Sequence, residues 1–185
     1  MGRPGPEGRG KATVLLAGRP LIEYPAAALD AVCDRGAVVC KAGTPLPPLA
    51  GWERWDEPDE PRHPLTGLVH ALGRAGGPVL ACAVDMPFVT VVDMRDLLRQ
   101  AAAHPSARAV VATSGGGLEP TLGVYAPAAL PFLWAAPAGA ALRSTVGTLE
   151  PRRVELPAAS VRQVNTPKEL TAAEAVLAGG QTGGR

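Results

Sequence analysis

The stretch Pro78-Val79-Leu80-Ala81-Cys82-Ala83-Val84-Asp85-Met86-Pro87-Phe88 decides the fold of this chain. The residues before Asp85 form an uninterrupted apolar run, which predicts a strand over residues 78–84 that is buried on both faces, as in a parallel sheet. Pro87 cannot donate a ladder hydrogen bond, so the chain leaves the sheet directly after Asp85. Open α/β sheets place their ligands at the carboxyl ends of their strands. Asp85 is therefore a candidate ligand for Mg²⁺, which prefers oxygen donors and phosphates.

Length and composition point to one globular domain that acts on small molecules. The chain has 185 residues, 46% of them apolar, with a net charge of +1 and only 4% aromatic residues. This balance argues against nucleic acid or a membrane surface as a partner. Cys33, Cys40 and Cys82 show no metal-binding or disulfide spacing and are expected to be buried, reduced thiols. Without a secretory signal or membrane span, a cytoplasmic location is expected, and the sequence leaves monomer and homo-oligomer open.

Apolar runs and helical periodicities alternate along the chain. Strands are expected at residues 13–16, 37–40, 52–55, 78–84, 108–113, 120–125, 152–155 and 161–164. Helices are expected at residues 20–32, 64–74, 93–104, 128–136, 139–148 and 167–177. This alternation predicts βαβ units and a largely parallel sheet in a single α/β domain over residues 12–177. The glycine- and proline-rich residues 1–11 are expected to be a flexible loop, and residues 178–185 a disordered tail.

Three polar residues besides Asp85 stand where a ligand could bind, each with a plainer alternative. Asp56 ends a predicted strand, although the acidic run that follows it, residues 57–60, is typical of a solvated loop. Lys11 follows the glycine-rich segment and could reach a polyphosphate, or simply be solvated. Asn165 precedes a helix that Thr166 can cap, and it could also face a cleft. Asp85 itself could be a strand-end aspartate that caps a turn.

The segment His63-Pro64-Leu65-Thr66-Gly67 opens a predicted helix. Its free backbone amides could receive a phosphate or the edge of a base, or could mark an ordinary helix start. His63, His70 and His104 lack the spacing of metal ligands. Neither a P-loop nor a G-x-S-x-G nucleophile motif is present in the sequence.

Seven segments, taken in order, carry a resemblance to a known family. They are Gly10-Lys11-Ala12, Leu16-Ala17-Gly18-Arg19-Pro20-Leu21-Ile22-Glu23, Asp56, Pro64-Leu65-Thr66-Gly67, Val84-Asp85-Met86-Pro87-Phe88, Glu119-Pro120-Thr121-Leu122-Gly123-Val124-Tyr125 and Val164-Asn165-Thr166-Pro167-Lys168-Glu169-Leu170. Each segment is weak alone, but together they cover residues 10–170. In their order and spacing they resemble the MobA-like nucleotidyltransferases, the family of the molybdenum cofactor guanylyltransferases.

The resemblance implies a single Rossmann-like, three-layer domain of the nucleotide-diphospho-sugar transferase type. It implies the transfer of GMP from GTP to molybdopterin with release of pyrophosphate. Asp85 would bind Mg²⁺ and act in catalysis together with Lys11, which would contact the phosphates. The residues implied to bind the nucleotide are Lys11, Asp56, Pro64, Leu65 and Gly67. Asn165 and Pro120 would lie on the side of the second substrate.

The chain departs from the family at its amino-terminal signature. The family has a strand and a Gly-Gly loop that wraps the triphosphate, whereas this chain lines up only from the Met-Gly that follows. The resemblance therefore implies that the first central strand is missing. One hypothesis is that Met1 is an internal methionine of a longer protein; if instead the chain is complete as given, poor GTP binding is expected. Loss of a central strand leaves its neighbours roughly two spacings of about 4.8 Å apart. A shift of residues 12–16 or a partner chain is expected to fill that gap.

Other functions stay open at this point. The chain could be a non-catalytic relative that keeps the fold as a binding module. Cys40 stands where relatives often have an asparagine that contacts the nucleotide, and a thiol cannot replace the paired donor and acceptor of an amide. CTP therefore remains a possible nucleotide, as in the cytidylyltransferases of the same superfamily. A pyrophosphorylase that makes nucleotide sugars is a further alternative.

Overall fold

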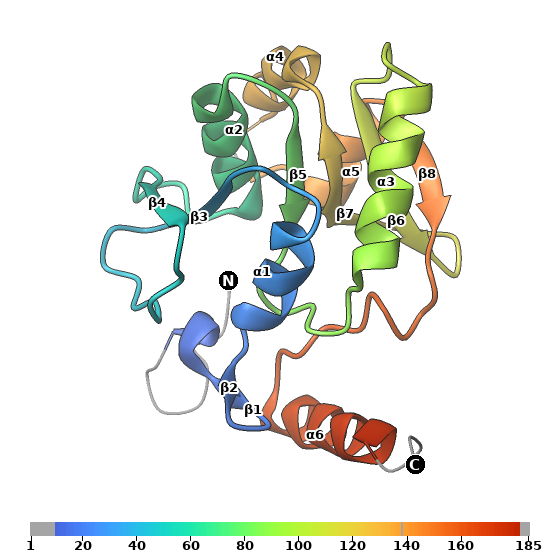
Figure 1. The fold of residues 1–185 in the computed structure, drawn as a ribbon. Coiled ribbons are helices and arrows are strands. Elements are labelled where there is room, and N and C mark those ends of the chain that lie inside the picture. The colour runs from blue at the N-terminus through green and yellow to red at the C-terminus, as the bar shows by residue number, and fades with distance from the viewer. Residues whose placement is uncertain (1–9, 138, 182–185) are drawn as a thin grey trace.

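The computed structural model describes residues 10–137 and 139–181. Its strands are β1 (Leu15–Leu16), β2 (Arg19–Pro20), β3 (Gly36–Cys40), β4 (Trp52–Asp56), β5 (Val79–Cys82), β6 (Ala109–Ser114), β7 (Gly117–Tyr125) and β8 (Arg152–Glu155). Its helices are η2 (Lys11–Thr13), α1 (Glu23–Asp30), α2 (Pro64–Ala75), α3 (Val91–Ala103), η3 (Pro127–Ala129), α4 (Leu130–Trp134), α5 (Leu142–Gly147) and α6 (Pro167–Gln181). Figure 1 shows a main body around β5–β8, and a smaller layer made by β1, β2 and α6.

The main sheet has four strands in the order β5-β7-β6-β8. β6 and β8 are parallel, and β7 runs antiparallel to both β5 and β6, so β5, β6 and β8 point the same way. β3 and β4 form a separate, parallel two-stranded sheet. The predicted α/β class is confirmed, with β7 as the strand that runs against the others.

Helices cover both faces of the main sheet, and each face has its own apolar core. On one face, Met94 and Leu97 of α3 pack on Val110 of β6. On the other face, Leu72 of α2 and Leu133 of α4 pack against residues of the same strands. Both faces are covered because successive side chains of a strand point to opposite faces of the sheet. The molecule therefore has the expected helix–sheet–helix layers.

Local sequence signals explain where the main helices begin and end. Thr90 and Asp93 form a capping box at the start of α3, in which each side chain accepts a hydrogen bond from the other residue's backbone N–H. His63 Nδ1 accepts from the Leu65 N–H at the start of α2, and Gly76 ends that helix with φ +70°. A left-handed residue of this kind favours glycine.

Several predicted elements are wrong in extent or type. The strand expected at 13–16 is the short helix η2 followed by β1, which pairs with β2 in a tight hairpin, so residues 12–16 do not move into the sheet. The stretch 161–164 is not a strand, because the Val164 N–H donates to the carbonyl of Asp85 instead of to a ladder. The helix expected from Pro20 begins at Glu23, and Pro25 therefore lies in its first turn. α4 and α5 are shorter than expected, and α6 extends to Gln181.

A cavity of about 790 Å³ separates the two sheets between β3 and β5. Within the described residues, no ladder joins β3 to β5. Residues 1–9, on which the predicted flexible loop mostly falls, lie outside the described residues, as do 182–185. No helix in the described part of the chain has the length and apolar character that a membrane crossing needs.

Candidate active site

Asp85 lies in the turn that follows β5, as the apolar run before it predicts. Its side chain is 13% exposed. The Asp85 carbonyl accepts a hydrogen bond of 2.8 Å from the Val164 N–H, which fixes the turn against the segment that leads into α6. The carboxylate is thus held at a strand end by two segments that are distant in the sequence.

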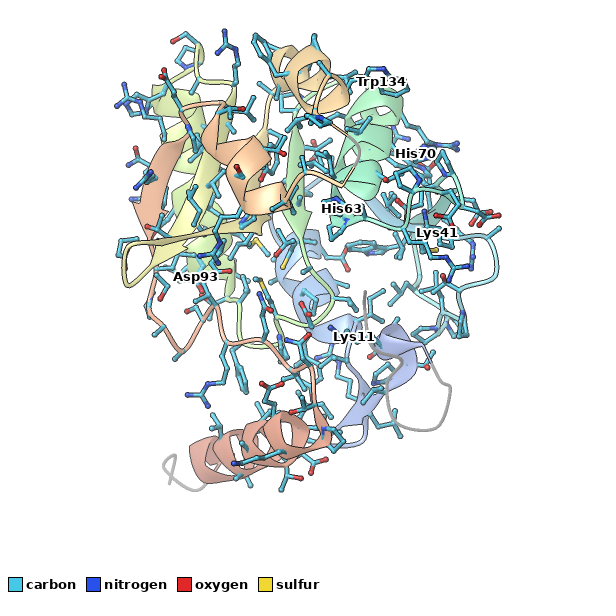
Figure 2. The ribbon with its side chains drawn as sticks, turned by 180° about the vertical axis from the view of Figure 1, so that it is seen from behind. Lys11, Lys41, His63, His70, Asp93 and Trp134 are labelled. Atoms are coloured by element: carbon cyan, nitrogen blue, oxygen red, sulfur yellow. The ribbon has the colours of Figure 1, made fainter. Side chains whose placement is uncertain are left out.

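Lys11 brings a positive charge to this carboxylate. Its Nζ lies 2.7 Å from Asp85 Oδ2 and donates a hydrogen bond to Asn165 Oδ1 at 2.6 Å. Lys11 begins η2, Asp85 follows β5 and Asn165 precedes α6, so three separate parts of the chain meet here. Figure 2 shows Lys11 between the main body and the layer that contains α6. Three predicted site residues are therefore brought together.

The segment around Asn165 is held by a second cap. Glu169 Oε2 accepts from the backbone N–H groups of Asn165 at 2.7 Å and Thr166 at 2.9 Å, and the Glu169 N–H donates to Thr166 Oγ1 at 3.2 Å. These hydrogen bonds lower the pKa of Glu169 below its ordinary value. Thr166 is thus the N-cap that the sequence predicts. The cap fixes the backbone from which the Asn165 amide reaches Lys11.

The oxygen atoms of Asp85 are suited to a magnesium ion that arrives with a phosphate substrate. Asp85 Oδ2 is used by Lys11, while Oδ1 is buried and has no hydrogen-bond partner among the described residues. A buried carboxylate oxygen without a partner is costly, so a cation or a donor is expected there. Mg²⁺ is usually held by one or two carboxylates together with substrate phosphates and water. The chemistry of this one carboxylate oxygen is compatible with Mg²⁺ that is held mainly by substrate phosphates and water, while the described residues contain no group of three or more metal-binding side chains.

Asp56 ends β4, as predicted, but its side chain points to a neighbour on its own strand. Asp56 Oδ1 lies 2.6 Å from Arg54 Nε, and the carboxyl group is half exposed. Asp56 does not line the cavity, whereas Glu57 does. The expectation that Glu57 belongs to a solvated loop is wrong, because its side chain is only 13% exposed and lies 3.4 Å from Lys41 Nζ.

Glu57 and Lys41 are candidate functional residues that the sequence reasoning missed. Glu57 Oε2 is buried and has no hydrogen-bond partner among the described residues. It lies beside Gly67, where a Cβ would come within 3.1 Å of it. Lys41 directly follows β3, and Glu57 directly follows β4. Their position after two strands was a signal that could have identified both of them.

The remaining predicted residues lie mostly along the cavity. Pro64, Gly67 and Pro120 line it, together with His63 and Val84. Leu65 of α2 does not, because its side chain packs against the apolar core on that face of the sheet. Lys11, Asp85 and Asn165 do not line the cavity, but Val84, the residue directly before Asp85, does. In Figure 2, Lys41 and His63 lie on the other side of this opening from Lys11.

Burial also determines the state of the cysteine thiols. Burial, with a smaller effect from the charge of Asp85, raises the pKa of Cys82 to about 12. Burial likewise raises the pKa of Cys33 and Cys40. All three cysteines are free. A raised pKa leaves less of the reactive thiolate form, so these thiols are weaker nucleophiles than free cysteine.

The fold and the side chains at its strand ends define an α/β protein of the nucleotide-diphospho-sugar transferase type. A family model described as the MobA-like NTP transferase domain matches residues 2–154. The chain belongs to this family of nucleotidyltransferases. A search of the curated proteins found no significant match.

Solved structures of low sequence identity share the fold. One is molybdopterin-guanine dinucleotide biosynthesis protein A from Archaeoglobus fulgidus, at 22% identity and a TM-score of 0.72, which covers 97% of this chain and 95% of that chain. Another is 2-C-methyl-D-erythritol 4-phosphate cytidylyltransferase from Thermus thermophilus, at 20% identity and a TM-score of 0.71, with 91% and 94% covered. A 4-diphosphocytidyl-2C-methyl-D-erythritol synthase from Anaerococcus prevotii has 9% identity and a TM-score of 0.71, with 95% and 93% covered.

Proposed function

We propose that this protein transfers GMP from GTP to molybdopterin and releases pyrophosphate. The observation that carries the proposal is the convergence of Lys11, Asp85 and Asn165 next to the cavity. Transfer of a nucleotidyl group needs in-line positioning of the reacting oxygens and neutralisation of phosphate charge more than it needs a covalent intermediate. A fixed ammonium group and a carboxylate with a free oxygen supply both requirements.

Each residue has a distinct role in this proposal. Lys11 Nζ leaves part of its present hydrogen bonding and donates to oxygens of the triphosphate. Asp85 holds Mg²⁺, which would supply charge neutralisation at the phosphates. Asn165 positions Lys11 and, with Pro120 of β7, is assigned to the side of the second substrate. Asp56, Pro64, Leu65 and Gly67 are assigned to the nucleotide side, where the positive end of the α2 dipole favours a phosphate.

The ion pair of Glu57 and Lys41 supports GTP over CTP. A carboxylate only accepts hydrogen bonds, and guanine offers it donors at N1 and N2, while O6 accepts from an ammonium group. The pairing edge of cytosine has one amino donor next to two acceptors, which would face the carboxylate unfavourably. Glu57 lines the cavity, and its Oε2 is a buried acceptor without a hydrogen-bond partner among the described residues. CTP is the second candidate because cytidylyltransferases share this fold.

The test is a screen for pyrophosphate release. GTP and CTP are supplied at millimolar concentration with Mg²⁺, because weak nucleotide affinity is expected for this chain. Molybdopterin and 2-C-methyl-D-erythritol 4-phosphate serve as acceptors. The proposal predicts release with GTP that depends on molybdopterin. Release with CTP and the methylerythritol phosphate would establish the second candidate, and no release with any pair would contradict both.

A further inference from the structure

Arg54 of β4 holds the loop that follows the neighbouring strand β3. Its guanidinium group donates to the backbone carbonyls of Lys41 at 2.8 Å, Thr44 at 2.9 Å and Ala42. Its Nε donates to Asp56 Oδ1 at 2.6 Å. A guanidinium presents five N–H donors in a fixed planar fork, so one side chain can hold several acceptors at once. The loop is thus tied to β4 by three hydrogen bonds in addition to the ladder between the two strands.

Arg54 and Asp56 lie on the face of β4 opposite to Glu57. Side chains alternate along a strand, and the Glu57 N–H continues the pairing by donating to the Cys40 carbonyl at 2.9 Å. Glu57 Oε2 lies beside Gly67 of α2, on the face that this helix covers. The side chain of Glu57 is 13% exposed, whereas that of Arg54 is 36% exposed. Any effect of Arg54 on Glu57 therefore passes through the loop and not through direct contact.

Lys41 makes the reciprocal connection, from the loop after β3 to the segment after β4. Its Nζ donates to the carbonyls of Pro58 and Pro61 and lies 3.4 Å from Glu57 Oε1. Because Arg54 fixes the backbone of Lys41, it also fixes the point from which this side chain extends. Each of the two cations thus belongs to one segment and holds the other.

The network ends at the cavity wall. The Pro61 carbonyl also accepts from the His63 N–H and from Thr66 Oγ1, both at 3.0 Å, which connects it to the start of α2. Lys41, Glu57 and His63 line the cavity, whereas Arg54 does not. Arg54 therefore holds groups that a ligand in the cavity can meet, without meeting the ligand itself.

We propose that Arg54, oriented by Asp56, is a positioning residue that determines how sharply the site selects the base of the nucleotide. The inference rests on the proposed nucleotide site, in which Glu57 meets the base. Arg54 holds Lys41, and Lys41 holds Glu57, so the carboxylate faces the base in one arrangement. A side chain discriminates between ligands only as sharply as its supporting contacts fix it. Without Arg54, the carboxylate turns to suit either base, and selectivity falls.

The test compares the binding of GTP and CTP, with Mg²⁺ and at up to millimolar nucleotide, by nuclear magnetic resonance of the protein. The ratio of the two Kd values reports base preference and needs neither an acceptor nor turnover. We expect the unchanged protein to prefer one base, and Arg54→Met to reduce that preference at least about fivefold. Arg54→Lys keeps the charge but not the fork, and should reduce it as well. Arg35→Met is the matched control, because Arg35 pairs with Glu53 at 2.6 Å at the amino end of the same sheet, and it should leave the ratio unchanged.

A double variant separates positioning from a general structural effect. Arg54→Met combined with Glu57→Gln should lower the preference no further than the stronger single change, because both act on one contact with the base. Additive losses would overturn the inference, since they would show that Arg54 acts independently of Glu57.

Three further results would overturn the inference. The first is the absence of binding or of base preference in the unchanged protein. The second is an unchanged preference in Arg54→Met, and the third is a full preference in Arg54→Lys, which would show that charge alone suffices. If Arg54→Met does not fold, Arg54→Lys still decides. A preference that depends on Arg54 without any pyrophosphate release would support the inference and contradict the proposed reaction.

Discussion

Lys11 Nζ and Asp85 Oδ2 lie 2.7 Å apart although 74 residues separate them in the sequence. Lys11 is 33% exposed and Asp85 is 13% exposed, so the pair lies at the surface end of the strand layer. Lys11 is partly exposed, so this ion pair contributes only modestly to folding stability, although Asp85 itself is largely buried. Its position next to the cavity and the free Asp85 Oδ1 instead suggest that substrate binding is its role. The predictions below separate these two roles.

Replacement of Lys11 tests its assigned contact with phosphates. We expect Lys11→Met to weaken nucleotide binding and lower pyrophosphate release at least tenfold, because the ammonium group that neutralises phosphate is lost. The melting temperature should change by no more than a few degrees. Arg95→Met, at an exposed position of α3, removes the same charge away from the site and should leave both quantities unchanged. Equal effects of the two variants would show that only overall charge matters.

Glu57 should influence the choice of base. Glu57→Gln keeps the size of the side chain but replaces one accepting carboxylate oxygen by an NH₂ group, which donates hydrogen bonds. We expect the ratio of kcat/KM for GTP to that for CTP to fall by about tenfold, the effect of about 1.4 kcal/mol of discrimination. Asp59→Gln, in the exposed part of the same acidic run, is the control. An unchanged ratio in Glu57→Gln would place the base elsewhere.

Two glycines should respond to alanine in opposite directions. A Cβ at Gly123 would come within 2.7 Å of the Val110 carbonyl oxygen in the middle of the main sheet, so the backbone must shift. We expect Gly123→Ala to cost about 1–3 kcal/mol of unfolding free energy. Gly73 lies in α2 with nothing within 4 Å of its Cβ position, and Gly73→Ala should add about 0.5–1 kcal/mol. Urea unfolding measures both values, and destabilisation by Gly73→Ala would contradict this account of α2.

The rate at which Cys82 is alkylated should continue to rise at pH values where the rate for a free cysteine is already constant. Thiolate is the reactive form, and a pKa of about 12 leaves only about one thiolate in ten thousand at pH 8. The rate of reaction with iodoacetamide should therefore rise about tenfold per pH unit up to pH 10, where a free cysteine with a pKa of about 8.5 has already reached its plateau. Mass spectrometry resolves the site. A plateau for Cys82 below pH 9 would show that its thiol is less buried than described.

The sequence alone predicts the parts of the fold that depend on local patterns. The apolar run before Asp85 predicts β5 and the turn that follows it. The capping residues Thr90 and Asp93 mark the start of α3. The strand expected at 161–164 is wrong because its apolar residues are buried without a ladder, and periodicity does not specify which backbone partner a segment has. The antiparallel direction of β7 depends in the same way on long-range pairing.

Part of the site could likewise be predicted from the sequence, and part depends on long-range contacts that local patterns do not specify. Asp85 can be found from its strand end, whereas the hydrogen bond between Lys11 and Asn165 was not predicted, because the resemblance placed Lys11 at the phosphates and Asn165 on the side of the second substrate. The role of Asp56 stays a prediction, since its carboxylate is paired with Arg54. Glu57 was not predicted as a site residue because an acidic run is typical of a solvated loop. Its burial comes from packing beside Gly67, which has no side chain to occupy that space.

The most direct test of the central claim compares pyrophosphate release by the unchanged protein and by Asp85→Asn, with GTP, molybdopterin and saturating Mg²⁺. The substitution keeps the shape of the side chain but removes the charge assigned to the cation. We predict that kcat falls at least about a hundredfold while the far-ultraviolet circular dichroism and melting temperature stay close to those of the unchanged protein. Release by Asp85→Asn within threefold of the unchanged protein would contradict the assignment of the site.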